Sequence, residues 1–107
     1  MPQLVNNFND YRTKMNEVVF GKDNLVLKRL GNQNTNTCAA GTLDVTTKEL
    51  IGLVANMVLR CDDCIKYYLG KAHKAGVTTE QLCEVFAVAN MVSSTIVVPH
   101  TRKAARY

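Results

Sequence analysis

Two cysteines three positions apart, Cys61 and Cys64, are the residues of this chain best suited to chemistry. On a helix they lie on nearly one face, so a disulfide can join them if Cys61 sits at the helix start. Unpaired backbone N–H groups there carry partial positive charge and stabilise a thiolate. Arg60 would strengthen this effect, whereas Asp62 and Asp63 would oppose it. The pattern indicates either dithiol redox chemistry or two buried thiols that pack as small hydrophobic residues.

The bulk properties of the chain place this pair in a small cytoplasmic domain. The chain has 107 residues, 47% hydrophobic and 21% charged, which is typical of one globular domain. Its net charge of +4 is scattered, without the basic stripe of nucleic-acid-binding proteins. We find no run of about 18 apolar residues that could span a membrane, and the segment 1–10 has no signal-peptide core. We therefore expect no nucleic-acid or membrane partner, and a compartment where structural disulfides are rare.

Metal binding is a less favoured interpretation of the cysteines. A structural zinc ion needs four ligands, usually two Cys-x-x-Cys pairs or one such pair with two histidines. The remaining candidates are spaced too irregularly to form a second pair; they are Cys38, Cys83, His73 and His100. We therefore expect no metal at the Cys-x-x-Cys pair.

Apolar residues recur at steps of three and four along most of the chain, which predicts amphipathic helices. We expect helices over the segments 5–20, 23–30, 47–59, 65–75, 79–93 and 100–106. The segment 93–98 is rich in β-branched residues but is too short and solitary to build a sheet. We interpret it as a continuation of the preceding helix or a packed turn, so the predicted fold class is all-α.

Local signals predict where several of these helices begin and end. Thr46 and Glu49 match a capping box, in which each side chain satisfies a backbone N–H of the other residue. Thr78 and Gln81 match a second one. Gly76 suits the left-handed position that follows a helix.

The segment 31–41 is rich in Gly, Asn and Thr, which predicts a break in the chain. We therefore expect residues 1–107 to form a single domain with two parts. An N-terminal helical arm, 1–41, would pack on a core, 42–107, that carries the cysteine motif.

Three blocks of sequence occur in a distinctive order. Glu49 precedes Cys61 by eleven intervening residues, and two more separate Cys61 from Cys64. The segments 74–82 (KAGVTTEQL) and 96–104 (IVVPHTRKA) follow. Together the blocks resemble the carboxymuconolactone decarboxylase family, whose superfamily includes the alkylhydroperoxidase-D-like proteins. The blocks span most of the predicted core, which makes the resemblance far more specific than the cysteine pair alone.

This resemblance implies an all-α fold, trimers or hexamers assembled through helices, and no organic cofactor or metal. For the peroxidase-like branch it implies that the Cys64 thiolate attacks a peroxide and becomes a sulfenic acid. Cys61 would then resolve it to a disulfide, which an external dithiol reduces. Glu49 would take part in the proton relay that deprotonates the thiols.

One position departs from the peroxidase motif. The family places a histidine four residues after the second cysteine, and here that residue is Tyr68. Tyrosine titrates at about 10 and histidine at about 6.5, so Tyr68 is a poor base at neutral pH. The proton relay to the cysteine thiols is therefore either lost or carried by a different residue. His100 is the natural substitute, because it lies in a segment that the family places near the active site; its alternative role is local hydrogen bonding at a helix start.

Three functions remain open from the sequence. We favour a peroxidase-like thiol–disulfide oxidoreductase that uses Cys64 and Cys61 on a small-molecule peroxide. The second is a decarboxylase or another acid–base enzyme acting on a small cyclic acid, with the cysteines incidental. The third is a non-catalytic oligomeric or redox-sensing module, in which Tyr68 marks the loss of catalysis. For Glu49, a structural role as the capping-box partner of Thr46 is as good an explanation as a catalytic role.

Overall fold

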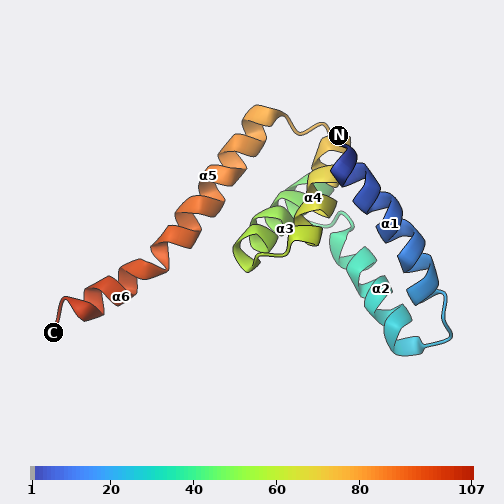
Figure 1. Cartoon of the computed structure of the whole chain (residues 1–107), viewed down its shortest axis with the longest axis horizontal. Coiled ribbons are helices and arrows are strands. Elements are labelled where there is room, and N and C mark those ends of the chain that lie inside the picture. Colours follow the sequence, from blue (N-terminus) through green and yellow to red (C-terminus); the bar gives the residue numbers. More distant parts are fainter. Residues whose placement is uncertain (1) are drawn as a thin grey trace.

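A computed structural model describes residues 2–107, which form six helices and no strand (Figure 1). The helices are α1 (Gln3–Phe20), α2 (Leu25–Cys38), α3 (Val45–Leu59), α4 (Asp62–Lys74), α5 (Thr79–Thr95) and α6 (Val97–Ala104). The all-α prediction is therefore confirmed, and each helix predicted from periodicity corresponds to one of these six.

Helices α1 to α4 pack together, while α5 and α6 extend from them as a C-terminal arm (Figure 1). The most extensive packing joins α3 to α4, and α1 lies against α4. Leu53 on α3 and Ala72 on α4 are almost fully buried, and Val5 on α1 and Ala89 on α5 are also buried. Of the described helices, α6 contacts only α5. The core is therefore small and centred on the α3–α4 pair.

The start of α3 differs from the predicted capping box. Asp44, not Thr46, is the N-cap, and its Oδ1 accepts a hydrogen bond from the backbone N–H of Thr47 at 2.7 Å. Hydrogen bonds from Thr47, first from its side chain and then from its backbone N–H, lower the pKa of the Asp44 carboxyl group below its ordinary value. The predicted pairing of Thr46 with Glu49 is therefore wrong. Two adequate caps lie close together here, and the chain uses the carboxylate, which also interacts favourably with the helix dipole.

The second predicted capping box, at the start of α5, is confirmed. The Gln81 N–H donates to Thr78 Oγ1 at 3.1 Å, and the Thr78 N–H donates to Gln81 Oε1 at 2.9 Å. Gly76 has φ of 81°, the left-handed conformation predicted for the residue that ends the preceding helix. These two signals together reverse the chain between α4 and α5.

The predicted break over 31–41 is wrong, because α2 continues through most of it. The helix starts at an Asn24 cap, whose side chain accepts a hydrogen bond from Leu27 N–H, and it runs on to Cys38. A Cβ at Gly31 would lie 3.2 Å from the Phe20 ring of α1, so α2 packs closely on α1 at this point. Tertiary packing therefore overrides the weak helix propensity of the Gly- and Asn-rich segment.

Lys48, at the start of α3, is joined to the end of α2 by hydrogen bonds. Its Nζ donates hydrogen bonds to the backbone carbonyls of Thr37 at 2.9 Å and Ala39 at 2.7 Å. These carbonyls belong to the last turn of α2 and its C-cap, where carbonyls lack partners within the helix. The Lys48 bonds therefore hold Cys38, which lies between the two carbonyls, in a defined place.

The segment 93–98 is helical except at Ile96, a turn that joins α5 to α6, so it combines the two predicted alternatives of a continued helix and a turn. α5 runs to Thr95 and α6 begins at Val97, three residues before the predicted start, with Pro99 in its first turn. By length and composition the stretch Thr79–Ala104 could cross a membrane, with a mean hydropathy of 1.6 over its best 18-residue window. Our expectation that the chain has no such stretch is therefore wrong. A helix apolar on most sides is equally typical of a buried protein interface.

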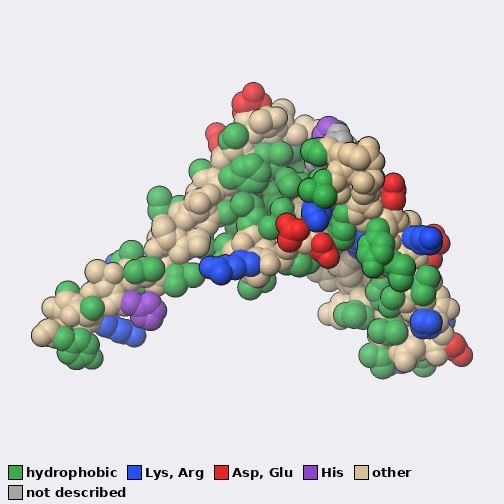
Figure 2. Space-filling model, viewed as in Figure 1, with side chains coloured by type: hydrophobic (Ala, Val, Ile, Leu, Met, Phe, Trp, Pro, Cys, Tyr) green, Lys and Arg blue, Asp and Glu red, His purple; other side chains and the backbone are tan. Residues whose placement is uncertain are grey.

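The fold leaves more surface exposed than a compact chain of its size. Its accessible area is 8081 Å², whereas roughly 6,000 Å² is expected for a globular chain of 11.9 kDa. The radius of gyration is 17.3 Å, compared with about 13 Å for a compact domain of this length. Figure 2 shows hydrophobic side chains gathered where α5 meets the bundle. Residues 90–107, the end of the C-terminal arm, are all exposed and contribute to this excess.

Candidate active site

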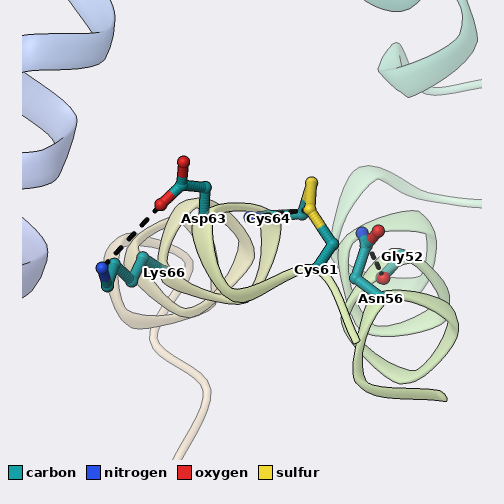
Figure 3. Close-up of a disulfide and its surroundings, with 6 residues drawn as sticks. All are labelled: Gly52, Asn56, Cys61, Asp63, Cys64 and Lys66. Atoms are coloured by element: carbon teal, nitrogen blue, oxygen red, sulfur yellow. Dashed lines mark hydrogen bonds and ion pairs between the residues drawn. A yellow bond between two sulfur atoms is a disulfide. The ribbon is translucent and has the colours of Figure 1, made fainter. Parts of the chain in front are cut away.

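Cys61 and Cys64 are joined by a disulfide at the start of α4, with an S–S distance of 2.16 Å (Figure 3). Arg60 ends α3 in the left-handed conformation, with φ of 63°, which turns the chain toward α4. The Cys61 N–H then donates to the Asn56 carbonyl at 2.9 Å. Cys61 is the N-cap of α4, and its Sγ accepts a hydrogen bond from the Cys64 N–H at 3.3 Å. The disulfide therefore occupies a helix N-terminus, which is the arrangement in which this spacing permits such a bond.

The two negative charges in the first turn of α4 are partly offset by a lysine, an effect that was not considered from the sequence. Asp62 and Asp63 both lie in this turn. Lys66 Nζ lies 3.1 Å from Asp62 Oδ2 and 3.8 Å from Asp63 Oδ1, the latter pair drawn in Figure 3. The lysine offsets part of the repulsion that two carboxylates would exert on a thiolate. When the disulfide is reduced, the helix N-terminus can then stabilise the ionised sulfur.

An open cleft of about 1150 Å³ lies between the N-terminal helices α1 and α2 and the start of α4. Among the described residues its wall includes Cys64 but not Cys61. A small molecule in the cleft can therefore approach the Cys64 sulfur. The assignment of Cys64, rather than Cys61, as the attacking residue stays a prediction.

Tyr68 lies in the same cleft, one helical turn beyond Cys64. Its ring packs against the backbone of α3, since a Cβ at Gly52 would lie 2.5 Å from two of its ring atoms. Burial, and then the nearby charge and hydrogen bond of Cys38, raise the pKa of Tyr68 above its ordinary value of 10.0. Tyr68 therefore stays protonated at neutral pH and acts as a hydrogen-bond donor, not as a base.

Cys38 is a cleft residue that the sequence did not identify. Its thiol lies within hydrogen-bonding reach of the Tyr68 hydroxyl and lines the same cleft as Cys64. The Cys38 Sγ also contacts Asn34 Oδ1 at 3.9 Å, one turn back on α2. No spacing rule connects Cys38 to the other cysteines, and the predicted break placed it in a loop. Its position depends on α2 continuing to residue 38.

Glu49 is buried on α3 with 7% of its surface exposed. It lies seven residues before Asn56, whose carbonyl contacts Cys61, so about 10 Å separates the two levels along the helix axis. Its Oε2 is buried with no hydrogen-bond partner among the described residues. A buried carboxylate oxygen without a partner costs free energy. Any influence of Glu49 on the sulfurs therefore has to pass through groups that lie between them.

His100 is not brought to the cleft within one chain. It lies on α6 and is exposed, and α6 contacts only α5 among the described helices. The structure therefore brings Cys61, Cys64 and Tyr68 together, with Glu49 about two turns away and His100 on the C-terminal arm. The same residues, 2–107, contain no cluster of three or more His, Cys, Asp or Glu side chains that could hold a metal ion.

An all-helical chain with a Cys-x-x-Cys pair at a helix start, open to a cleft, is a small helical dithiol protein. A profile of the carboxymuconolactone decarboxylase family matches residues 25–107. The chain belongs to this family, as the three sequence blocks indicated. The match begins at the first residue of α2 and includes the cysteine pair, Tyr68 and the whole C-terminal arm.

Two crystal structures of a carboxymuconolactone decarboxylase family protein of Thermotoga maritima are similar to this chain. Each is 42% identical in sequence and covers 92% of this chain, with TM-scores of 0.74 and 0.76. The alignments cover 84% and 87% of the Thermotoga chains. A part in the antioxidative response has been suggested for that protein.

Two uncharacterised bacterial proteins are also similar over shorter stretches. Protein 4 in the cox locus of Paracoccus denitrificans is 35% identical over 66 residues, which are 62% of this chain and 60% of that protein. A protein of Cupriavidus necator is 38% identical over 48 residues, which are 45% of this chain and 42% of that protein. The chain therefore matches less than two thirds of the length of either relative.

Proposed function

We propose that this protein is a thiol–disulfide oxidoreductase that reduces peroxides at Cys64. The observation that carries the proposal is the position of Cys64: it is paired with Cys61 at a helix N-terminus and lies in the wall of an open cleft. Low-pKa thiols next to a resolving cysteine are what peroxide-reducing sites require. The antioxidative role suggested for the Thermotoga maritima relative supports the same function.

The proposed cycle has three steps, and the disulfide is its oxidised product. The Cys64 thiolate attacks one oxygen of a hydroperoxide, the O–O bond breaks, and the alkoxide that leaves takes up a proton to become an alcohol. Cys64 is now a sulfenic acid, and attack by the Cys61 thiol on its sulfur releases water and forms the disulfide. An external dithiol then reduces this disulfide by exchange and is itself oxidised. We place this cycle in the cytoplasm.

The test is a peroxide titration of the fully reduced protein. The chain has four cysteines, and one equivalent of hydroperoxide is expected to remove two free thiols. Mass spectrometry should show the loss of two hydrogen atoms, and peptide mapping should place the bond between Cys61 and Cys64. A pair that stays reduced in excess peroxide would contradict the proposal. Turnover of a cyclic acid by the double variant Cys61→Ser, Cys64→Ser would instead support the acid–base alternative.

Substitution of Tyr68 by histidine is expected to increase the rate of peroxide reduction. Because the pKa of Tyr68 is raised above 10.0, the wild-type residue cannot accept the Cys64 proton at neutral pH. A histidine one turn from Cys64 can, and the gain should be roughly tenfold to a hundredfold at pH 7. The rate should rise with pH through about 6.5, as the imidazole loses its proton.

The matched control for this change is Tyr68→Phe, which removes the hydroxyl group and keeps the ring. Stopped-flow measurement of Cys64 oxidation should show a gain for Tyr68→His and none for Tyr68→Phe. Equal rates in the two variants would mean that residue 68 does not exchange protons with the sulfur. The site would then use another relay or belong to a redox-sensing module.

We further propose that the protein works as a homo-oligomer in which the C-terminal arm of one copy covers α3 and α5 of the next. A groove of about 670 Å³ between α3 and α5 is lined by apolar residues and a single polar one, Thr47. Its rim includes Ile51 and Val88, which are 54% and 55% exposed. The excess surface of the chain also exceeds the roughly 800 Å² that each partner buries in a standard interface.

A further inference from the structure

Two cations meet on one aromatic ring inside the Cys64 cleft. The Arg12 guanidinium carbon lies 3.8 Å from the centroid of the Tyr67 ring, and Lys71 Nζ lies 5.2 Å from it. Arg12 comes from α1 and Lys71 from α4, and both side chains are half-buried cleft residues. Helix packing therefore brings two positive charges to the same part of the cleft.

Neither of these cations has a carboxylate partner within residues 2–107. The ion pairs within this part of the chain join Lys66 to Asp62 and Asp63. Asp63 is the acidic residue in the described wall of the cleft, and it is the one that Lys66 already contacts. A third cation, Lys28, also lines the cleft without an ion pair. The cleft therefore has an excess of positive charge, which favours an anionic ligand.

The rest of the cleft provides apolar surface. Phe8 and Phe20 of α1 and Leu30 of α2 line it, on the N-terminal helices that face the start of α4. A ligand that uses both features needs an anionic group and a hydrocarbon portion. A carboxylate also suits an arginine geometrically, because the guanidinium can donate two parallel hydrogen bonds to it.

We propose that the cleft binds hydroperoxides of aliphatic carboxylic acids, with the carboxylate between Arg12 and Lys71 and the peroxide at Cys64. This inference rests on the proposed function, for which it names the substrate class. Lys71 lies seven residues beyond Cys64 on α4, a span of roughly 10 Å along the axis. The hydrocarbon chain between the carboxylate and the peroxide has to bridge this distance, with its remainder on the apolar wall. Reaction at Cys64 then follows the cycle given above and yields the hydroxy acid.

The experiment compares the 9-hydroperoxide of linoleic acid with its methyl ester, which differs by one charge. Stopped-flow measurement of Cys64 oxidation in the wild-type protein should favour the acid by roughly tenfold to a hundredfold, as expected for charged hydrogen bonds. Arg12→Gln and Lys71→Gln should each reduce this preference, because each slows the reaction of the acid more than that of the ester. Lys74→Gln, an exposed lysine of the same helix outside the cleft, is the matched control and should keep the preference.

A binding measurement separates this inference from the proposed function. Linoleate itself carries no peroxide, and its binding can be followed by tyrosine fluorescence, because the chain has no Trp and Tyr67 lies at the site. Charge-dependent binding of linoleate without any consumption of peroxide would overturn the function and support the site. Equal rates with acid and ester, or an Arg12→Gln variant slowed equally with both, would overturn the site and leave the function standing.

Discussion

Cys64→Ser is expected to abolish peroxide reduction, because a serine hydroxyl does not ionise at neutral pH and cannot attack the O–O bond. The loss should be on the order of a thousandfold or more, as is usual when the nucleophile of a covalent mechanism is removed. Cys61→Ser should differ qualitatively. It leaves the sulfur that lies in the cleft intact, so the first step proceeds and the cycle stops before the disulfide forms.

This difference can be measured in a single turnover. After one equivalent of hydroperoxide, the Cys61→Ser variant should hold a sulfenic acid at Cys64, which a dimedone probe traps as a mass adduct. Cys83 is an exposed thiol on α5 and outside the cleft, so Cys83→Ser serves as the control and should turn over at the wild-type rate. An adduct at Cys61 in the Cys64→Ser variant, with retained activity, would reverse the assigned roles.

The second large effect is expected from placing a charge in the groove between α3 and α5. Ile51→Asp or Val88→Asp alters a side chain that is more than half exposed in the single chain, where the substitution should change stability little. In the proposed oligomer the same aspartate is buried without a partner, which costs several kcal/mol. The dissociation constant of the assembly should therefore rise by on the order of a hundredfold or more.

Sedimentation equilibrium distinguishes these cases directly. The wild-type protein should sediment as an oligomer, and the two groove variants should shift toward the 11.9 kDa monomer. Val26→Asp is the matched control, since Val26 is 73% exposed and apolar but lies on α2, outside the groove. A monomeric wild-type protein at micromolar concentration would contradict the assembly. Binding of that monomer to lipid vesicles would instead assign the arm to a membrane.

The sequence predicts the helices well because most of them repeat apolar residues every three or four positions, which is the period of one helix face. It fails where packing between distant segments decides the outcome. α2 continues through Gly31 because the ring of Phe20, on another helix, lies against it. The cap of α3 is misplaced by two residues because Asp44 and Thr46 are both good caps, and a local rule does not rank them.

The residues of the candidate site likewise fall into those that the sequence could predict and those that it could not. Cys61, Cys64 and Tyr68 lie within two turns of one helix, so their proximity follows from spacing alone. Cys38 and Arg12 reach the cleft only because α1 packs on α4 while α2 packs on α1 and α3, and no periodicity specifies those contacts. The expected role of His100 depends on where the C-terminal arm goes, and in one chain the arm leads away from the cleft.

The close fit between Gly52 and Tyr68 has a consequence for how this site can change by mutation. A methyl group at position 52 would occupy the space of the tyrosine ring, with ring atoms 2.5 Å away. The two positions are therefore epistatic: Gly52→Ala is tolerated only after residue 68 has become smaller. Tyr68 can be replaced by histidine in a single substitution. Once residue 52 also carries a side chain, however, tyrosine cannot return at position 68, because its ring would collide with that side chain.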